Sequence, residues 1–477
     1  MTGHRRVVII GGGYSGAASA MTLARQAGAP LEISVVEPRA QLGAGTAYAT
    51  AEPAHRLNVQ DSLMVVHADA IDDFSRWLTD TGVRAADRDG HGADGQFYAR
   101  RSDFARYMGE QVARFTADNA SGSAIVHVRD RAVGLAATAT GAEVTLAGGA
   151  RLDAELVVVA LGNEAPAVPG GLPAPVLAHP GYLADPWDNA ALARVPADAR
   201  VLLIGSGLTA ADVIASLTAH GHRGPVLAVS RRGLLPQGQG QFPGVEELLR
   251  RISQPVPILV QQHGMPKRVA EVLAWVRSDV AAAAARGEPW HDAVDAVRDA
   301  ANSIWPALTL AERRRYFRHL KPFYDSHRFR LAPQVEAVLQ GEMARGRLAL
   351  RAARIVAAEA RGDRLQVALR PRHGTATESE PADVVVNCTG PNPDPARSGS
   401  TLLRDAIDRG LLATDPSGVG LAVDGGSQTL RRDGGANARI LALGPLTKGR
   451  FAEVVAVPQI TVHLQALAAR LRTDGLL

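Results

Sequence analysis

The sequence predicts an α/β fold with two Rossmann-like domains, one inserted within the other, and a helical cap. Two observations lead to this prediction. A pattern of strand, glycine turn, helix and strand at residues 7–37 recurs with the same offsets at residues 201–231. Proline-rich segments at 166–173 and 391–395 bracket the second copy. An internal repeat of this kind indicates two copies of one supersecondary unit, and this unit is typical of dinucleotide-binding domains.

Composition excludes several classes of protein. The chain has 477 residues, of which 46% are hydrophobic and 21% charged, so a globular protein of two or three domains is expected. The 52 basic and 48 acidic residues give a net charge of +4. The basic residues are scattered, so no nucleic-acid partner is expected. No metal site is expected either.

The single cysteine, Cys388, excludes an intramolecular disulfide and a CxxC redox pair. With no partner in view, it is expected to be a packing residue. No apolar run approaches the ~18 residues that a membrane helix needs. The first apolar stretch, 7–10, enters a glycine turn at once and does not resemble a signal peptide. A soluble, cytoplasmic protein without membrane contact is expected.

The first copy starts with the strand 7–10 and continues through Gly11, Gly13 and Gly16 into an alanine-rich helix. Gly11 allows a tight turn, Gly13 lets the backbone approach a pyrophosphate, and Gly16 lets helix and strand pack closely. The free N–H groups of the helix start, Ser15 included, favour phosphate. Glu37 ends the second strand, where it can accept hydrogen bonds from a ribose. The alternative is a glycine-rich connector without a ligand.

The second copy has Gly205, Ser206 and Gly207 in its turn, with Ala210 at the third position. Its second strand ends in Arg231 and Arg232 instead of an acid. Arginine at this point can bind a 2′-phosphate, which predicts NADPH in the second site. FAD is then expected in the first site, and two dinucleotides on one chain imply hydride transfer between them. The alternative is that the two arginines are only a solvated surface pair.

The linkers divide the chain into an FAD domain at 1–165, an NADP domain at 166–383 and a second part of the FAD domain at 384–477. The strand at 384–388 is expected to begin that second part, and a last strand at 439–443 ends in Gly444. The following helix, from about Val457, is expected to point its start at the flavin. Residues 240–335 have helical periodicity and are expected to form a cap over the NADP domain.

Several segments together resemble a known family. They are Gly43–Tyr48, His55–Val59 with Met64, Ser230–Gly233, Asp325–Arg330 and Gly444–Leu446. The chain resembles, over essentially its whole length, bacterial FAD/NAD(P)-binding proteins whose relatives include an FAD-dependent urate hydroxylase and an aspartate N-monooxygenase.

The resemblance implies that segments 43–48 and 56–64 lie beside the flavin ring, with Thr46 and Asn58 among the cofactor contacts. It also places four residues close to the flavin edge, namely Tyr98, Arg101, Phe104 and Tyr107. One departure is Pro445, which stands where many such flavoproteins have an aspartate for the ribityl chain. The backbone of Leu446 is the candidate substitute.

A flavin reduced by NADPH can pass electrons to a quinone, a disulfide or dioxygen, and the disulfide route lacks its cysteine pair. With dioxygen, a flavin C4a-hydroperoxide would deliver one oxygen atom to a small-molecule substrate. No side chain is needed as nucleophile, and no catalytic residue is assigned; the protein excludes water and orients its ligands.

Substrate contacts are expected at His327, Arg328 and Arg330, where cationic groups alternate with aromatic residues. Guanidinium groups suit a flat anion, which makes hydroxylation of urate to 5-hydroxyisourate the leading hypothesis. The alternative for these arginines is that they bridge domains or hold NADP phosphates. An N-hydroxylase of an amino acid or amine is the second hypothesis. A flavin-bearing redox sensor or electron-transfer partner, binding through the cap, is the third.

Overall fold

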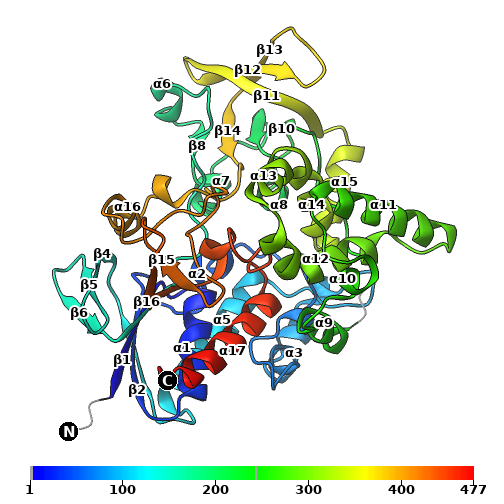
Figure 1. Cartoon of the computed structure of the whole chain (residues 1–477). Coiled ribbons are helices and arrows are strands. Elements are labelled where there is room, and N and C mark those ends of the chain that lie inside the picture. Colours follow the sequence, from blue (N-terminus) through cyan, green and yellow to red (C-terminus); the bar gives the residue numbers. More distant parts are fainter. Residues whose placement is uncertain (1–3, 242–243) are drawn as a thin grey trace.

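A computed structural model describes residues 4–241 and 244–477. It contains a six-stranded sheet, a seven-stranded sheet, a three-stranded sheet and a group of helices (Figure 1). Each large sheet contains one of the two repeated units, so the predicted α/β fold with two Rossmann-like domains is confirmed.

The first sheet has the strand order β15-β16-β7-β1-β2-β3. All neighbouring strands are parallel except β15 and β16, which are antiparallel. The strands are β1 (Arg5–Ile10), β2 (Leu31–Val36), β3 (Ala124–Val128), β7 (Leu156–Val159), β15 (Gln428–Leu430) and β16 (Ala436–Ala442).

Alternation along β1 gives this sheet two buried faces. Val7 and Ile9 pack in one core with α1 (Tyr14–Gln26), α5 (Arg101–Ala117) and α17 (Val457–Thr473). The neighbouring side chains of β1 point to the opposite face. There they pack against a meander of β4 (Ala132–Ala137), β5 (Ala142–Leu146) and β6 (Arg151–Ala154), together with α16 (Thr401–Asp408). Both faces are therefore covered, as parallel sheets require.

The second sheet has the strand order β13-β12-β11-β10-β9-β14-β8. Its parallel part is β8 (Tyr182–Leu183), β14 (Val384–Asn387), β9 (Val201–Ile204), β10 (Val226–Ser230) and the first half of β11 (Leu348–Arg361). The far half of β11 pairs antiparallel with β12 (Arg364–Pro371), which pairs with β13 (Glu378–Ala382). α8 (Leu208–Ala219) and α15 (Pro333–Ala344) contribute to the core on one face.

The predicted boundary at residue 384 is too early. β14 was expected to begin the second part of the FAD domain, yet it pairs in parallel with β9 through Val384↔Val201 and with β8 through Val385↔Tyr182. The second sheet therefore includes β14. The first sheet resumes only with β15 and β16, which follow the proline-rich linker.

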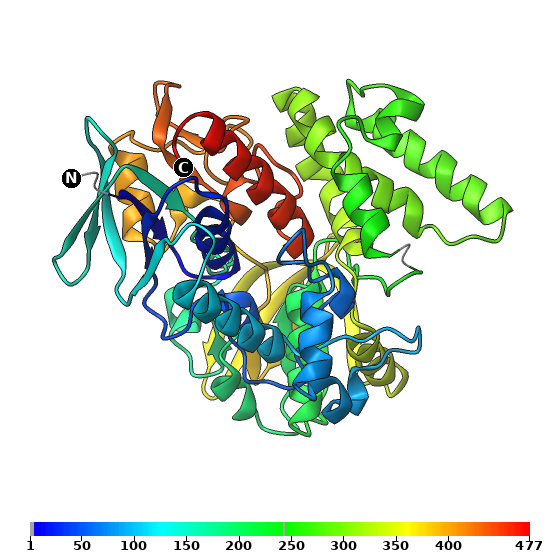
Figure 2. The same ribbon diagram turned by 90° about the horizontal axis from the view of Figure 1, so that it is seen from below.

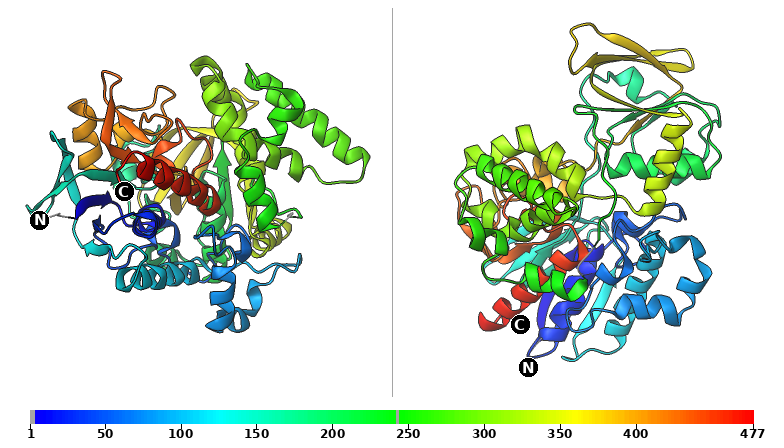
Figure 3. Two further views of the ribbon diagram at one scale, coloured as in Figure 1. Left: turned by 60° about the horizontal axis from the view of Figure 1, so that its bottom comes forward. Right: turned by 90° about the vertical axis from the view of Figure 1, so that its right-hand side faces the viewer.

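The cap consists of α9 (Val245–Ile252), α10 (Ile258–His263), α11 (Val269–Ala285), α12 (His291–Ala307), α13 (Leu310–Arg315), a π-helical turn η3 (Tyr316–Leu320) and α14 (Lys321–Arg328). These helices were expected over the NADP domain, but the structure shows that they contact both domains. The cap lies beside α17 and the preceding loop of the first domain (Figures 2 and 3). Trp305 Nε1 donates to the Gly449 carbonyl at 2.9 Å, and Ala452 of the same loop packs against the apolar core of the cap.

Short elements complete the chain: α2 (Gly45–Tyr48), α3 (Asp73–Asp80), α4 (Val83–Ala86), α6 (Ala174–Leu177), α7 (Asn189–Ala193) and the 3₁₀ turns η1 (Asp61–Leu63), η2 (Arg88–Gly90), η4 (Pro395–Arg397) and η5 (Gly444–Thr447). Among the residues that the structure describes, no helix combines the length and apolarity needed to cross a bilayer.

Candidate functional site

The first glycine turn joins β1 directly to α1. Gly11 has φ of +100°, and a Cβ there would lie 2.5 Å from the Ala160 carbonyl oxygen. Gly16 holds α1 so close to the turn that a Cβ would stand 1.8 Å from the Gly11 carbonyl oxygen. Apart from the chain neighbours of Gly13, only atoms of Gly45 lie within 4 Å of its Cβ position in the described ranges. Because glycine has no side chain, α1 starts without a side-chain cap, and free N–H groups at a helix start favour phosphate.

Glu37 lies against this turn at the end of β2. It is buried, its Oε2 accepts from the Gly12 N–H at 3.0 Å, and its Oε1 accepts from the Arg39 N–H at 3.0 Å. Oε1 also accepts from Arg39 Nη1 at 3.2 Å, so Oε2 is the carboxylate oxygen with a lone pair left for a ribose hydroxyl. The residue therefore stands where a ribose acceptor was predicted, and its chemistry fits the adenosine ribose of FAD.

Other expected cofactor contacts come together around the same turn. The Gly43 N–H donates to the Gly12 carbonyl at 2.8 Å. Thr46 is exposed on α2, and its Oγ1 accepts from Arg39 Nη2 at 3.1 Å. From the other end of the chain, Gly444 approaches with φ of +68°, and a Cβ there would lie 2.6 Å from Ser15 Oγ. The close approach explains why glycine stands at this position.

Asn58 lies apart from that group, where the two domains meet. Its carbonyl oxygen accepts a hydrogen bond from Gln239 Nε2 at 2.6 Å. Gln239 belongs to the loop that follows β10 in the second domain. A contact of Asn58 with cofactor stays a prediction.

The second glycine turn repeats the geometry of the first. Gly205 has φ of +121°, and a Cβ there would lie 2.2 Å from the Cys388 carbonyl oxygen. Among the described residues, no heavy atom comes within 4 Å of the Cβ position of Gly207, and α8 also lacks a side-chain cap. Ser206 differs from expectation: its Oγ donates to the Leu234 carbonyl at 2.6 Å and lies 2.8 Å from Ser230 Oγ. Its side chain holds the loop after β10, which leaves its backbone for a phosphate.

Arginines line a cavity of about 370 Å³ at the carboxyl edge of the second sheet. We call it the arginine pocket; it is lined by Arg231, Arg232, Arg318, Arg354, Arg370 and Arg372, with Pro322, Ala353, Pro371 and Gly374. No carboxylate lines it, and within the described part of the chain none of the six guanidinium groups forms an ion pair. Arg231 and Arg232 thus lie among four further arginines, and their contact with a 2′-phosphate stays a prediction.

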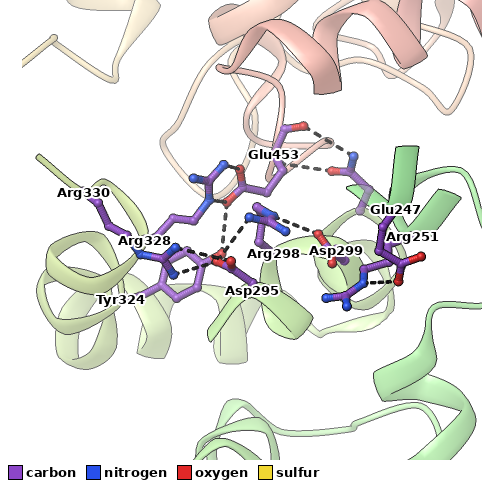
Figure 4. Close-up of polar contacts among 10 residues, drawn as sticks. Glu247, Arg251, Asp295, Arg298, Asp299, Tyr324, Arg328, Arg330 and Glu453 are labelled. Atoms are coloured by element: carbon purple, nitrogen blue, oxygen red, sulfur yellow. Dashed lines mark hydrogen bonds and ion pairs between the residues drawn. The ribbon is translucent and has the colours of Figure 1, made fainter. Parts of the chain in front are cut away.

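Arg328 and Arg330, expected to bind substrate, are engaged by carboxylates (Figure 4). Arg328 Nη2 donates to Glu453 Oε2 at 2.9 Å, and Arg330 Nη2 donates to Asp295 Oδ1 at 2.7 Å. The Tyr324 hydroxyl donates to Glu453 Oε1 at 3.0 Å. These carboxylate partners do not favour the expected contact with a flat anion. The alternative, that they bridge parts of the fold, describes them: Arg328 joins the cap to the first domain.

Electrostatics support this ion-pair cluster. Burial raises the pKa of Asp295, but Arg298 and Arg330 outweigh it and hold that pKa below its ordinary value. Burial also raises the pKa of Tyr324, which stays a neutral donor. His327 makes a local contact, with its Nδ1 2.7 Å from the Phe323 carbonyl oxygen.

The segment expected near the flavin edge is divided between the two cores: Phe104 and Tyr107 pack in the first and Tyr98 in the second. All three are at most 1% exposed, and the ring centroids of Phe104 and Tyr48 are 4.7 Å apart. Arg101 does something else: it forms a buried ion pair with Asp212 on α8 of the second domain, at 2.9 Å. The proximity of these residues to flavin stays a prediction.

Sequence reasoning missed the residues that join the domains. Besides Asp212, Ser216 on α8 lies with its Oγ 2.9 Å from His55 Nε2. Glu453 was missed too. One signal was present in the printed sequence: Asp212 and Glu453 are single acids within otherwise apolar stretches, and buried acids of this kind require partners. No group of three or more His, Cys, Asp or Glu side chains is arranged to hold a metal within the described ranges.

Comparisons with known proteins agree with this geometry. No curated protein matches the sequence. Residues 8–164 match the model of a family described as FAD-NAD(P)-binding. The ornithine N-hydroxylase of Kutzneria sp. 744, with reduced FAD, NADP⁺ and L-ornithine, has a similar structure: the TM-score is 0.66, the identity 16%, and the match covers 99% of this chain and 100% of that chain.

Two further structures are similar at lower scores. The L-lysine 6-monooxygenase of Pseudomonas syringae has a TM-score of 0.59 at 18% identity, over 98% of this chain and 99% of that chain. The thioredoxin reductase of T. acidophilum has a TM-score of 0.52 at 14% identity, over 99% and 100%. The chain thus has the fold of flavoproteins with two dinucleotide-binding domains, and residues 8–164 carry the sequence pattern of the FAD-NAD(P)-binding family.

Proposed function

We propose that this protein is an FAD- and NADPH-dependent monooxygenase that hydroxylates the nitrogen of an amino acid or another amine. One observation carries the cofactor part of this proposal. In each domain a strand, β1 or β9, leads through a glycine turn into a helix whose start has no side-chain cap. The first turn lies beside Glu37, and the arginine pocket belongs to the domain of the second turn. These are the groups that a free ribose and a 2′-phosphate respectively require.

The chemistry follows from the two cofactors. FAD, when bound, supplies the electron carrier that takes hydride from NADPH and activates dioxygen. The overall reaction balances as NADPH, a proton, dioxygen and an amine giving NADP⁺, a hydroxylamine and water. The chain's residues bind and orient: the N–H groups of α1 and α8 hold phosphates, and Glu37 orients a ribose. With one cysteine in the whole sequence, a dithiol relay is not open to this chain.

The paired state of Arg328 and Arg330 bears on the choice between urate and an amine as the substrate. Urate was the leading hypothesis because of the family resemblance and the candidate contacts His327, Arg328 and Arg330, and both arginines are paired with carboxylates. The similar structures named above include an ornithine N-hydroxylase and a lysine monooxygenase. That likeness supports an amine substrate, so N-hydroxylation takes first place and urate hydroxylation becomes the competing outcome of the test.

The test is an oxygen-electrode measurement on the flavin-loaded protein with NADPH. L-Ornithine, L-lysine, L-aspartate and urate are added in turn, while hydrogen peroxide and hydroxylamine products are assayed. Faster oxygen uptake with an amine, without matching peroxide, and with a hydroxylamine product, supports the proposal. A response to urate alone overturns the substrate class. Oxidation of NADPH without oxygen uptake overturns the monooxygenase.

A further inference from the structure

Three separate parts of the chain build the arginine pocket. Arg231 and Arg232 follow β10 and belong to the repeated dinucleotide unit. Arg354, Arg370 and Arg372 come from β11, β12 and the residue after β12, outside that unit. Arg318 comes from the cap, on the π-helical turn η3. π-Helical turns are rare and occur frequently at functional sites.

The charge of the pocket exceeds what the repeated unit needs. Six guanidinium groups face one cavity without a carboxylate among its lining residues, whereas many other arginines of the chain form ion pairs, including Arg328 and Arg330. A phosphate monoester carries about −1.5 to −2 charge and offers three acceptor oxygens. Several arginines at once can bind one such group, each through charge-assisted hydrogen bonds.

The cap meets the second domain at this pocket. The guanidinium of Arg232 lies over the ring of Phe323 on α14, 5.4 Å from its centroid. In the same loop, the Gln237 N–H donates to the Ser326 carbonyl at 2.8 Å, and its carbonyl accepts from the Leu331 N–H at 2.9 Å. The same helix α14 carries Tyr324 and Arg328, which bind Glu453 of the first domain. The cap therefore connects the arginine pocket with the first domain.

We propose that the arginine pocket binds the 2′-phosphate of NADPH with Arg318 of the cap and Arg370 of β12 as further ligands, so that the cofactor's phosphate ties the cap to the second domain. This inference rests on the proposed use of NADPH and goes beyond it. It makes the 2′-phosphate a cross-link between three parts of the chain, and it gives the cap a direct role in selecting NADPH over NADH.

The experiment measures equilibrium binding of 2′,5′-ADP and of 5′-ADP by titration calorimetry. The variants are Arg318→Ala, Arg370→Ala and Arg231→Ala. Arg277→Ala is the matched control, because Arg277 is an exposed arginine on the cap helix α11 outside the pocket. Hydrogen exchange of residues 310–330 with and without 2′,5′-ADP reports on the cap itself. Arg318 and Arg277 lie on the cap, and Arg231 and Arg370 lie on the second domain. All four side chains are exposed, so the variants should fold.

The proposal expects wild-type protein to bind 2′,5′-ADP more tightly than 5′-ADP, with a preference that weakens as salt increases. Arg318→Ala and Arg370→Ala each reduce affinity for 2′,5′-ADP by about tenfold, and Arg277→Ala leaves it unchanged. Binding of 2′,5′-ADP slows hydrogen exchange of residues 310–330 in the wild-type protein but not in Arg318→Ala.

Two results overturn it in different ways. If only Arg231→Ala loses affinity while Arg318→Ala and Arg370→Ala behave like the control, Arg318 of the cap and Arg370 of β12 are not ligands and the NADPH proposal stands. If wild-type protein binds 2′,5′-ADP no better than 5′-ADP, the proposed preference for NADPH falls together with this inference.

Discussion

Arg101 on α5 and Asp212 on α8 form a buried ion pair across the two domains, with Nη2 and Oδ2 2.9 Å apart. Neither side chain is more than 7% exposed. Burial raises the pKa of Asp212, and the Arg101 guanidinium opposes that shift. Beside this pair, His55 Nε2 lies 2.9 Å from Ser216 Oγ, one turn further along α8. Because both contacts are made by α8, they hold the helix that starts at the second glycine turn against the first domain.

Removal of one partner of this pair is expected to be costly. Arg101→Met leaves Asp212 buried without its cation, which should lower the free energy of unfolding by about 3–5 kcal/mol. The double variant Arg101→Met/Asp212→Leu should recover most of that loss, because no buried charge remains. Urea unfolding measures both. Arg106→Met is the control: Arg106 is on the same helix with an exposed partner, Glu110, and its loss should stay below about 1 kcal/mol.

Flavin binding is expected to depend on the absence of a side chain at Gly16, in the first glycine turn. In Gly16→Ala, the new Cβ would stand 1.8 Å from the Gly11 carbonyl oxygen, so α1 must move away from the turn that faces the phosphates. We expect purified Gly16→Ala to lose most of its flavin absorbance. Gly28→Ala introduces the same methyl group where no atom lies within 4 Å and should retain flavin. Equal flavin content in the two variants would contradict the assignment of this turn to FAD.

The choice between NADPH and NADH is expected to depend on Arg231. Its guanidinium lines the arginine pocket at the end of β10, where a 2′-phosphate would lie. Loss of a charge-assisted hydrogen bond should raise KM for NADPH by ~10-fold to ~100-fold, with little change for NADH, which lacks that phosphate. Steady-state kinetics with both nucleotides measures this. An equal rise for both would mean that Arg231 does not contact the phosphate.

Local sequence patterns predicted the parts of the molecule whose structure is set by near neighbours. The glycine turns are of this kind, since the φ of Gly11 and Gly205 and the contact of Gly16 with Gly11 involve residues close in the chain. Two strands and a helix of each repeated unit follow from the same short-range pattern. The predictions for α1, β9 and α8 are therefore confirmed within about a residue.

Long-range partners could not be predicted. β14 has the same apolar pattern as β7, and only its pairing with β8 and β9 shows to which sheet it belongs. The amphipathic pattern of the cap helices predicts that one face of each helix is buried. It does not indicate which surface of the protein that face packs against. The partner of Arg328 was missed for this reason: Glu453 lies 125 residues away in the chain, and nothing local to Arg328 reveals that partner.

Acid is expected to destabilise the protein from near-neutral pH downward. Burial lowers the pKa of His55 and His67 to about 4, whereas an unfolded histidine titrates near 6.5. Both are neutral in the folded state, so unfolding takes up protons below pH 6.5. The stability is full above that pH and falls as pH drops toward 4, by about 2 kcal/mol per histidine at pH 5. Urea unfolding at pH 7 and pH 5 measures the loss. The His55→Gln variant should lose less stability between pH 7 and pH 5 than the wild-type protein. A stability that does not change with pH would contradict buried, neutral histidines.

The thiol of Cys388 is expected to be unreactive in the folded protein. Cys388 is 4% exposed at the end of β14, and burial raises its pKa well above that of a free thiol. Only the thiolate reacts with disulfide reagents, so both access and ionisation oppose the reaction. Titration with a chromogenic disulfide at pH 8 should report no fast thiol in native protein and one in urea. Because Gly205 packs against the Cys388 carbonyl, the reaction rate at low denaturant reports the opening of the second glycine turn. A fast native reaction would show that the end of β14 opens independently of global unfolding.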